Sequence, residues 1–587
     1  MRSPAEIHDL SLREAIGDFV SYHVRAVELS EVLRLLDRVG FASIDAFGGT
    51  TFLPTMKILG EDPWERLRAI RRSVTATPLQ AVLRGQFVFS SRRAPLSTIR
   101  ATLHHLRHLG VDRIKVVDLG LDHVGAQGVV AMAKDLGFGT TATISIPWGR
   151  GGGAGTDLCA LAAGYVAAGA DAIGLQDPFG ALNPVELGDL VGRYVAGCAV
   201  PLRLHLHDAN LLAVAGVHAG LQAGARAVDT TVSALSWAYS PPPAEAVLMA
   251  LRGGPFEPDI DVHALEEAAA WFEELKTKKG FLYRELYGVD HANFRGELPA
   301  AVRRALEDEL RERGRADLGE AAWKAVPPVW DALGRPPLLN PLVRAICSQA
   351  IEEVLSGSPF ERLDPKVSAY LRGDFGPPRP EARSDLVKRA EAEEPGAPAL
   401  LPDVNELDPA DFASEDDRLT YALFPRVAGD FFRLRASGGQ AQPEVYPTAA
   451  QGGAEAAPTI PRRLVLKRHG EAHEVVLEGM GPQEWGKRTF FVRIGGQLAH
   501  LEVTLPEPGA PPVYTVFHHG RRHRVEFVEV CPPGRASVPV LLREDGNLHE
   551  VLYAIPRPFR WARRLRGRRS PLDEPSRLTQ SEPPPAE

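Results

Sequence analysis

Two histidines separated by one residue, His205 and His207, carry the strongest chemical signal in this sequence. They stand at the end of an apolar segment, LRLHLHDAN from Leu202, that has the pattern of a β-strand. Residues i and i+2 of a strand point to the same face, so both imidazoles present nitrogens to one point. Neutral imidazole suits Zn²⁺, Mn²⁺ or Co²⁺. The spacing predicts a divalent metal site. The alternative is a pair of surface or core histidines that happen to lie two residues apart and bind no metal.

Three further side chains could complete such a site. Glu14 follows the segment EIHDLSLRE, and with the two histidines it would form a two-His, one-carboxylate set. Arg13 beside it is a fixed cation suited to a carboxylate or an enolate oxygen. Arg84, in LRGQ, also follows an apolar segment. The alternatives are a helix-start glutamate for Glu14 and a buried ion pair with Asp118 or Asp45 for Arg84.

The elements that must position these residues form a repeating pattern from residue 1 to about 255. Short apolar segments such as FASIDAFGG, RIKVVDLG and DAIGLQDPFG alternate with amphipathic stretches that close on glycine. About eight such units indicate an α/β fold of the TIM (β/α)₈ barrel type over residues 1–300. A doubly wound sheet is the rival fold, but no G-x-G-x-x-G follows the first strand. Polar residues fall at the expected strand ends, where a barrel has its active site: Asp45, Gln86, Asp118, Gln176, Asp177 and Asp229.

The rest of the chain changes character three times. Residues 301–435 have helical periodicity and predict a helical domain. Residues 436–462 are rich in Gly, Ala, Pro and Gln and predict a flexible linker. Residues 463–556 alternate about turns such as Gly495-Gly496, which predicts a small β-hairpin domain. The Arg-, Pro- and Ser-rich residues 557–587 predict a disordered tail.

The bulk composition narrows the function classes. Net charge is −8, which gives no case for nucleic-acid binding. The 4 cysteines form no CxxC pair, which favours a reducing compartment. The N-terminus lacks the apolar region of a signal peptide, and no run of about 18 apolar residues predicts a membrane span. We therefore expect a soluble, cytoplasmic protein.

Several stretches together resemble the carboxyltransferases of biotin-dependent enzymes. These stretches are DLSLREA, LGEDPWERLRAIRR, LQAVLRGQ, LHLHDAN and VWDALGRPPLLNP, between about Ile7 and Gly373. The family includes the carboxyltransferase domain of pyruvate carboxylase, the oxaloacetate decarboxylase α-subunit and the transcarboxylase barrel subunit. The resemblance implies transfer of CO₂ between carboxybiotin and pyruvate through a metal-stabilised enolate. It also implies that His205 and His207 bind the metal, and that Arg13 and Arg84 bind the substrate.

Four positions depart from the family pattern. Glu14 stands where the family has a metal-binding aspartate, and Gly17 stands where it has a glutamine. Gln176 stands at the position of a carbamylated lysine, and Tyr239 falls near the threonine that relays a proton. Glutamine cannot be carbamylated, and tyrosine does not fit the volume of threonine. These departures predict a metal site with three protein ligands, Glu14, His205 and His207.

The family's biotin lysine lies in an Ala-Met-Lys-Met motif, and here only Met56 among 5 methionines precedes a lysine. The resemblance therefore implies that biotin arrives on a separate carrier, with a separate biotin carboxylase, and that the barrels pair as a homodimer. Three hypotheses remain open. The chain is a carboxyltransferase subunit, a catalytically degenerate scaffold or regulator of such a complex, or a metal-dependent acyl-CoA lyase or aldolase on the same barrel.

Overall fold

A computed structural model gives the fold of the chain as two compact units. It describes residues 3–15, 19–118, 122–148, 157–236, 239–279, 281, 289–290, 292, 297–393 and 400–437, and eight strands between residues 463 and 554. Gly17, the linker after residue 437 and the tail after residue 554 lie outside the described residues. The first unit contains all the side chains considered below.

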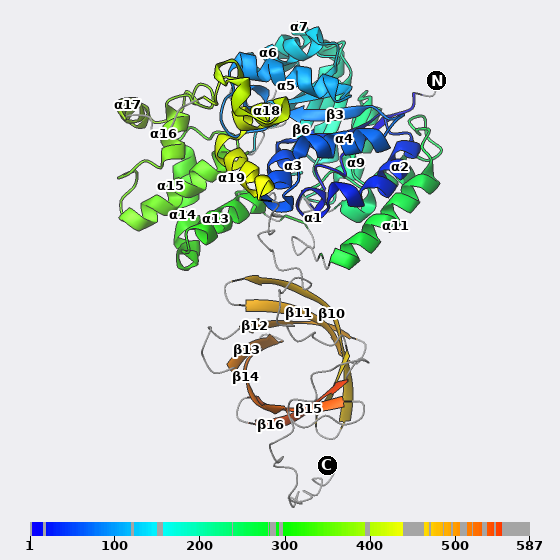
Figure 1. Cartoon of the computed structure of the whole chain (residues 1–587), viewed down its shortest axis with the longest axis vertical. Helices are drawn as coiled ribbons and strands as arrows, with labels where there is room; N and C mark the ends of the chain where they lie inside the picture. The colour runs from blue at the N-terminus through cyan, green and yellow to red at the C-terminus, as the bar shows by residue number, and fades with distance from the viewer. Residues whose placement is uncertain are drawn as a thin grey trace, which may run out of the picture. The chain divides into compact units, whose positions relative to one another are not determined.

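The centre of the first unit is a closed barrel of eight parallel strands (Figure 1). Each strand pairs with the next one in the sequence, and β1 also pairs with β8, which closes the sheet. The strands are β1 Glu6–Asp9, β2 Ser43–Gly48, β3 Leu79–Leu83, β4 Arg113–Asp118, β5 Gly139–Ser145, β6 Ala172–Asp177, β7 Leu202–Leu206 and β8 Ala227–Thr230. Short apolar strands of this kind are buried on both faces because helices cover the outside. The predicted TIM barrel is confirmed.

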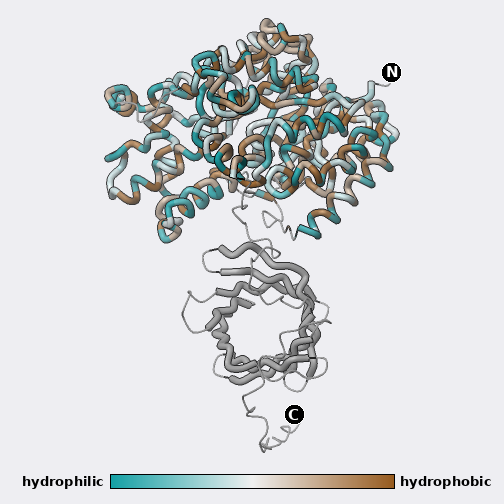
Figure 2. Tube along the Cα trace, viewed as in Figure 1, coloured by the Kyte–Doolittle hydropathy of each residue, from teal (hydrophilic) through white to brown (hydrophobic). Residues whose placement is uncertain are grey.

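The covering helices follow the strands around the barrel. They are α2 Ser30–Val39, α4 Pro63–Ser73, α5 Leu96–His108, α6 His123–Asp135, α7 Leu158–Ala167, α8 Pro184–Gly197, α9 Ala213–Gln222, α10 Ala244–Leu251 and α11 Val262–Lys279. Capping residues fix several boundaries. The Asn183 side chain accepts hydrogen bonds from Val185 and Glu186 at the start of α8, and Gly40 ends α2 at a φ of 90°. Along these helices the hydropathy alternates between polar and apolar, as amphipathic packing requires (Figure 2).

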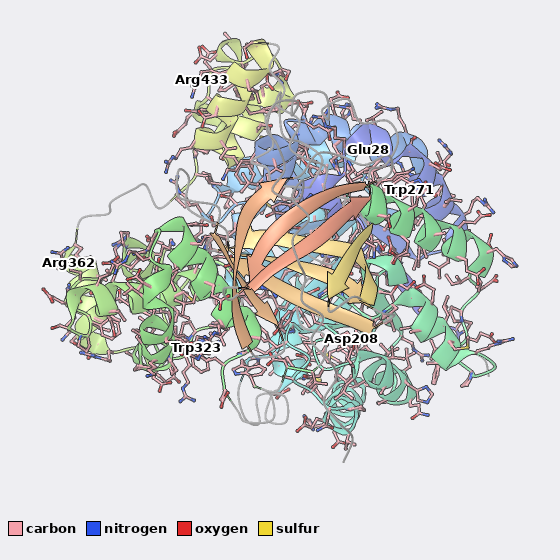
Figure 3. All side chains as sticks on the ribbon, turned by 90° about the horizontal axis from the view of Figure 1, so that it is seen from below. Glu28, Asp208, Trp271, Trp323, Arg362 and Arg433 are labelled. Carbon is pink, nitrogen blue, oxygen red and sulfur yellow. The ribbon has the colours of Figure 1, made fainter. Side chains whose placement is uncertain are left out.

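A helical region follows the barrel, as predicted. It contains α13 Ala300–Glu312, α14 Gly319–Ala332, α15 Leu342–Ser356, α16 Pro365–Leu371 and α17 Ser384–Ala392. These helices enclose a core of their own that includes Leu306, Val326 and Ile346. They lie on one side of the barrel and α11 lies on the other, as Trp323 on α14 and Trp271 on α11 mark (Figures 1 and 3).

Two last helices, α18 Glu415–Leu423 and α19 Pro425–Ala436, return to the barrel. The Trp64 indole on α4 donates a hydrogen bond to the Thr420 hydroxyl at 2.9 Å. The Phe424 ring stacks on Phe52 with 5.2 Å between the ring centroids. The segment from 415 to 436 is therefore part of the outer layer of the barrel.

The second unit is a closed antiparallel barrel. Its strands are β9 Arg463–Arg468, β10 Glu471–Glu484, β11 Lys487–Ile494, β12 Gln497–Thr504, β13 Val513–His518, β14 Arg521–Val530, β15 Ser537–Glu544 and β16 Asn547–Ala554. Neighbouring strands in the sequence pair with each other, and β16 pairs with β9. The β-rich C-terminal region expected from the alternating pattern is confirmed, with closure of the sheet as an additional finding.

Candidate metal centre

The ends of β7 and β1 bring the predicted ligands together. His205 belongs to β7 and His207 comes directly after it, so the two side chains lie on the same face. Glu14 follows β1 in a turn whose backbone N–H donates to the Leu10 carbonyl at 2.8 Å. Because β1 and β7 both flank β8, the turn and the strand end meet at the C-terminal mouth of the barrel.

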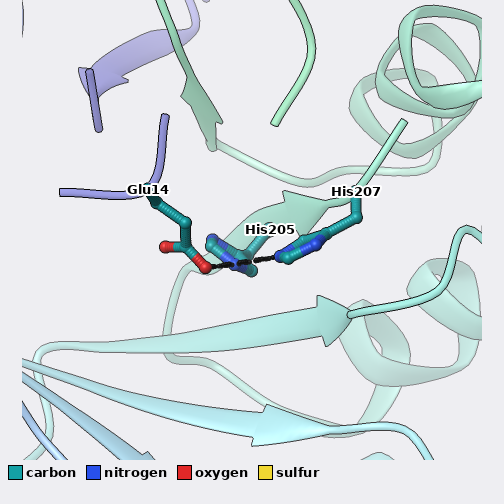
Figure 4. Close-up of side chains that lie close together, drawn as sticks. All are labelled: Glu14, His205 and His207. Atoms are coloured by element: carbon teal, nitrogen blue, oxygen red, sulfur yellow. Dashed lines mark hydrogen bonds and ion pairs between the residues drawn. The ribbon is translucent and has the colours of Figure 1, made fainter. Parts of the chain in front are cut away.

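The three side chains converge on one point (Figure 4). The Nε2 atoms of His205 and His207 are 3.2 Å apart. Glu14 Oε1 lies 3.3 Å from each of these nitrogens. One ligand atom from each residue lies within 4.8 Å of the others, and this is the one such group among the residues that the structure describes. The arrangement has the donor types and the convergence that a divalent transition metal requires.

Buried charges hold His205 in place from behind. Its Nδ1 lies 2.7 Å from Asp229 Oδ2 on β8. The Lys115 ammonium on β4 donates to the same carboxylate oxygen at 2.6 Å, and the Arg203 Nε donates to the other oxygen at 2.5 Å. An ionised carboxylate against Nδ1 keeps the proton on that nitrogen, which leaves Nε2 with a lone pair toward the cluster. Asp229 therefore orients His205 as a ligand.

The electrostatics favour an ionised Glu14 carboxylate and a neutral His207, and they shift the pKa of His205 in the opposite direction from that of His207. Burial opposes ionisation of Glu14, but the Arg13 guanidinium and His205 outweigh it and hold its pKa well below the usual value. Burial is also the main cause that lowers the pKa of His207. For His205, burial and Lys115 lower the pKa, but Glu14 and Asp229 outweigh them and raise it. Displacement of that proton by a metal ion would release it to solvent.

The predicted arginines follow two different strands, β1 and β3. The Arg13 guanidinium donates to Glu14 and, at 3.1 Å, to Asp45, so it is fixed beside the cluster. Arg84 lies at the end of β3 in a tight turn, where its N–H donates to the Val88 carbonyl at 2.9 Å. Val88 has a φ of 52°, a strained conformation for a β-branched residue. Of the two aspartates considered as partners for Arg84, Asp45 accepts from Arg13, and Asp118 pairs with His123 and accepts from Tyr165.

Two of the substituted positions have other partners. The Gln176 carbonyl oxygen accepts a hydrogen bond from the Ser145 hydroxyl at 2.7 Å, and Gln176 pairs in register with His205. The Tyr239 hydroxyl donates to Asp290 at 2.9 Å and accepts from the Ala301 N–H at the start of α13. Tyr239 thus joins the barrel to the helical region. The third position, Gly17, lies outside the described residues.

Lys115 and Arg203 are not predictable as site residues from the strand pattern, which marks Asp229 only as a strand-end residue. All three are buried inside the barrel, with Lys115 and Arg203 at 1% exposure. A signal was available, because Lys115 and Arg203 each stand between two apolar residues of a buried strand. Their shared partner lies on a third strand, and only the closed sheet brings the three together.

Comparison with known proteins bears first on the barrel. Residues 6–271 match the model of the HMGL-like family. The carboxyl transferase domain from Rhizobium etli pyruvate carboxylase with pyruvate has a TM-score of 0.66 at 23% identity, over 86% of this chain and 89% of that one. At this identity the likeness shows the fold.

Curated relatives give a narrower placement. A pyruvate carboxylase subunit of Methanocaldococcus jannaschii is 28% identical over 81% of this chain and 84% of its own. The 2-oxoglutarate carboxylase large subunit of Hydrogenobacter thermophilus is 28% identical over 93% and 88%. The methylmalonyl-CoA carboxyltransferase 5S subunit of Propionibacterium freudenreichii is 27% identical over 85% and 96%. The chain is a homologue of these subunits, and the resemblance predicted from the sequence is confirmed.

Among the described residues, no helix is long and apolar enough to cross a membrane.

Proposed function

We propose that this chain is the carboxyltransferase subunit of a biotin-dependent carboxylase that acts on a 2-oxo acid. The observation that carries the proposal is the convergence of Glu14, His205 and His207 at the mouth of the barrel. The support from comparison is that two relatives matched over four-fifths or more of the chain are a pyruvate carboxylase subunit and a 2-oxoglutarate carboxylase subunit.

Glu14, His205 and His207 would hold a divalent metal, with Zn²⁺, Mn²⁺ and Co²⁺ as the candidate ions. When bound, the metal supplies Lewis-acid polarisation of the keto group of the substrate. The fit rests on the two imidazole Nε2 atoms that face the Glu14 carboxylate at equal distances. Three protein ligands leave coordination positions open for substrate or water, as catalytic sites do.

The arginines take the anionic part of the substrate. Arg84 stands at the end of β3, where a guanidinium can bind the carboxylate of a 2-oxo acid in bidentate fashion. Arg13 keeps Glu14 ionised and places positive charge beside the position where the enolate oxygen would form. Both cations therefore lower the energy of a negatively charged intermediate.

The reaction balances without an external oxidant or reductant. The N–C bond of carboxybiotin breaks, and a C–C bond forms at the carbon next to the keto group. The proton lost from that carbon ends on the biotin nitrogen. Biotin would reach the barrel on a separate carrier polypeptide, loaded by a separate biotin carboxylase, since the relatives are themselves named as subunits. We further propose a cytoplasmic location and a homodimer that forms through the barrel.

The reverse reaction gives the most direct test. The purified full chain is mixed with oxaloacetate and free biotin, and pyruvate is measured with lactate dehydrogenase. With pyruvate as the acceptor, the proposal requires decarboxylation that depends on both the protein and biotin and that His207→Ala abolishes. A parallel assay measures carboxylation of pyruvate and of 2-oxoglutarate with a biotinylated carrier and a biotin carboxylase, which identifies the acceptor.

The contacts of Gln176 and Tyr239 favour a second candidate, a non-catalytic scaffold within the same complex. Both side chains are engaged in bonds that stabilise the fold, so neither is poised to react. Capture of the biotinylated carrier without turnover of either 2-oxo acid would support the scaffold and contradict the enzyme. Cleavage of a 2-oxo acid or acyl-CoA without biotin would instead support a lyase.

A further inference from the structure

The two imidazoles of the cluster differ in the hydrogen-bond partner of Nδ1. His205 Nδ1 has a charged partner, Asp229, at 2.7 Å. His207 Nδ1 is buried and has no hydrogen-bond partner among the described protein atoms. Because His207 Nε2 faces Glu14 and His205, Nδ1 lies on the other side of the ring. A buried N–H left without an acceptor costs about 1–3 kcal/mol.

A cavity of about 10 Å³ lies beside this ring. Its lining includes His207, Asn210 and Asp177, with Leu182, Leu206 and Leu212 as apolar walls. Asn210 Oδ1 is also buried and has no partner among the described atoms. A cavity needs a volume of about 10–15 Å³ and two to four polar neighbours to hold one water molecule. The cavity has the size and the polar groups for one water molecule.

The orientation of Asn210 is fixed by a neighbour. Its side-chain nitrogen donates to the Gly180 carbonyl at 2.5 Å. A carbonyl can only accept, so the amide nitrogen must face Gly180 and the amide oxygen must face elsewhere. Asp177 is held by the N–H groups of Phe179, Ala181 and Leu182 and supplies only acceptor atoms.

We propose that Asn210 is a positioning residue that acts through one buried water to fix the tautomer of His207. This inference rests on the proposed function, because it assigns His207 as a metal ligand. The water donates its two hydrogens to Asn210 Oδ1 and to the Asp177 carboxylate. The water then has only its oxygen lone pair to offer His207, so His207 Nδ1 must carry a proton and donate it to the water. His207 Nε2 is left unprotonated and presents its own lone pair to the metal.

The test measures binding of Co²⁺ to the metal-free full chain by titration of visible absorption. Asn210→Leu has similar volume and no acceptor, and we expect affinity about 10- to 100-fold weaker than wild type. Asn210→Gln keeps both the amide donor for Gly180 and the acceptor for the water, and its affinity is expected to stay within about threefold. Asn183→Ala is the matched control, since it removes the N-cap of α8 and lowers the melting temperature without changing Co²⁺ affinity.

Unchanged affinity in Asn210→Leu, or an equal loss in Asn210→Gln, would overturn the proposal. A crystal structure of the metal-free wild-type protein gives an independent readout if Asn210→Leu does not fold. Density for a water within hydrogen-bond distance of His207 Nδ1 and Asn210 Oδ1 supports the proposal, and a direct contact or a dry cavity overturns it. If the wild-type protein binds no Co²⁺, the metal assignment in the proposed function fails, and this crystal structure still decides the water site.

Discussion

Replacement of Asp229 by asparagine removes the one carboxylate that the buried cations Lys115 and Arg203 share. Both cations have side chains at 2% exposure, and Asp229 is at 0%. Burial raises the pKa of Asp229, but Arg203 and Lys115 outweigh it and hold the pKa well below the usual value, so the carboxylate is ionised at neutral pH. The variant therefore keeps two buried positive groups and loses their counter-charge.

The magnitude follows from the cost of an unpaired buried charge. Removal of one partner from a buried ion pair costs about 3–5 kcal/mol. Arg203 keeps a weaker contact with Asp45 at 3.9 Å and a hydrogen bond to the Gln80 side-chain oxygen at 3.2 Å. We therefore expect a decrease in the free energy of unfolding of about 3 kcal/mol, toward the lower end of that range. His205 also loses the acceptor of its Nδ1 proton, so Co²⁺ affinity should fall about 10- to 100-fold.

Urea unfolding and Co²⁺ titration measure the two effects separately. Asp430→Asn is the control, because the Asp430–Arg433 pair is about three-quarters exposed and should contribute at most about 1 kcal/mol. The double variant Asp229→Asn/Lys115→Met removes one orphaned cation. It should be more stable than the sum of the single changes predicts, by about 1–3 kcal/mol. The coupling between Asp229 and Lys115 would be refuted if the losses in free energy of unfolding were additive in this cycle, or if Asp229→Asn lost less than about 1 kcal/mol.

Three shorter predictions concern Asp9, Tyr239 and His207. Burial raises the pKa of Asp9 to about 7, so the folded protein binds this proton more tightly than the unfolded chain does. The protonated carboxyl therefore contributes its full share to the free energy of unfolding below about pH 4, and this contribution is lost as the pH rises through 7. Asp9→Asn should therefore gain stability relative to wild type between pH 4.5 and pH 8 in urea midpoints, and a constant difference would contradict the pKa assignment. Tyr239→Phe should lower the free energy of unfolding by about 1–3 kcal/mol, because it leaves Asp290 without this donor; loss of turnover with unchanged stability would instead indicate a direct role in the reaction. Elemental analysis should find a stoichiometric transition metal in the wild-type protein and none in His207→Ala, whereas full retention in the variant would place the metal elsewhere.

The sequence predicted most of the barrel because each strand carries its own local signal. An apolar segment, a polar end and a glycine that closes the next helix recur without reference to distant residues. The His205–His207 pair was predictable for the same reason, since alternation along one strand decides which side chains share a face. Glu14 needed one step more, the assumption that the first and seventh strands come close at the barrel mouth.

The remaining contacts depend on residues far apart in the chain. Lys115 and Asp229 are separated by 114 positions, and their contact follows from the closure of the sheet. Tyr239 was expected near a proton-relay position, and its bond to Asp290 depends on how the helical region packs on the barrel. Side-chain partners of this kind follow from packing, which no local pattern encodes.

The return of α18 and α19 to the barrel has a consequence for how the protein can be divided. Thr420 and Phe424 meet the indole of Trp64 and the ring of Phe52, and Asp416 forms an ion pair with Arg68 at 2.7 Å. A fragment that ends at residue 300 would leave this aromatic surface in water. The barrel and the segment 415–436 thus pack together as parts of one folding unit. A peptide of that segment, supplied separately, should bind to the shortened barrel and restore its stability.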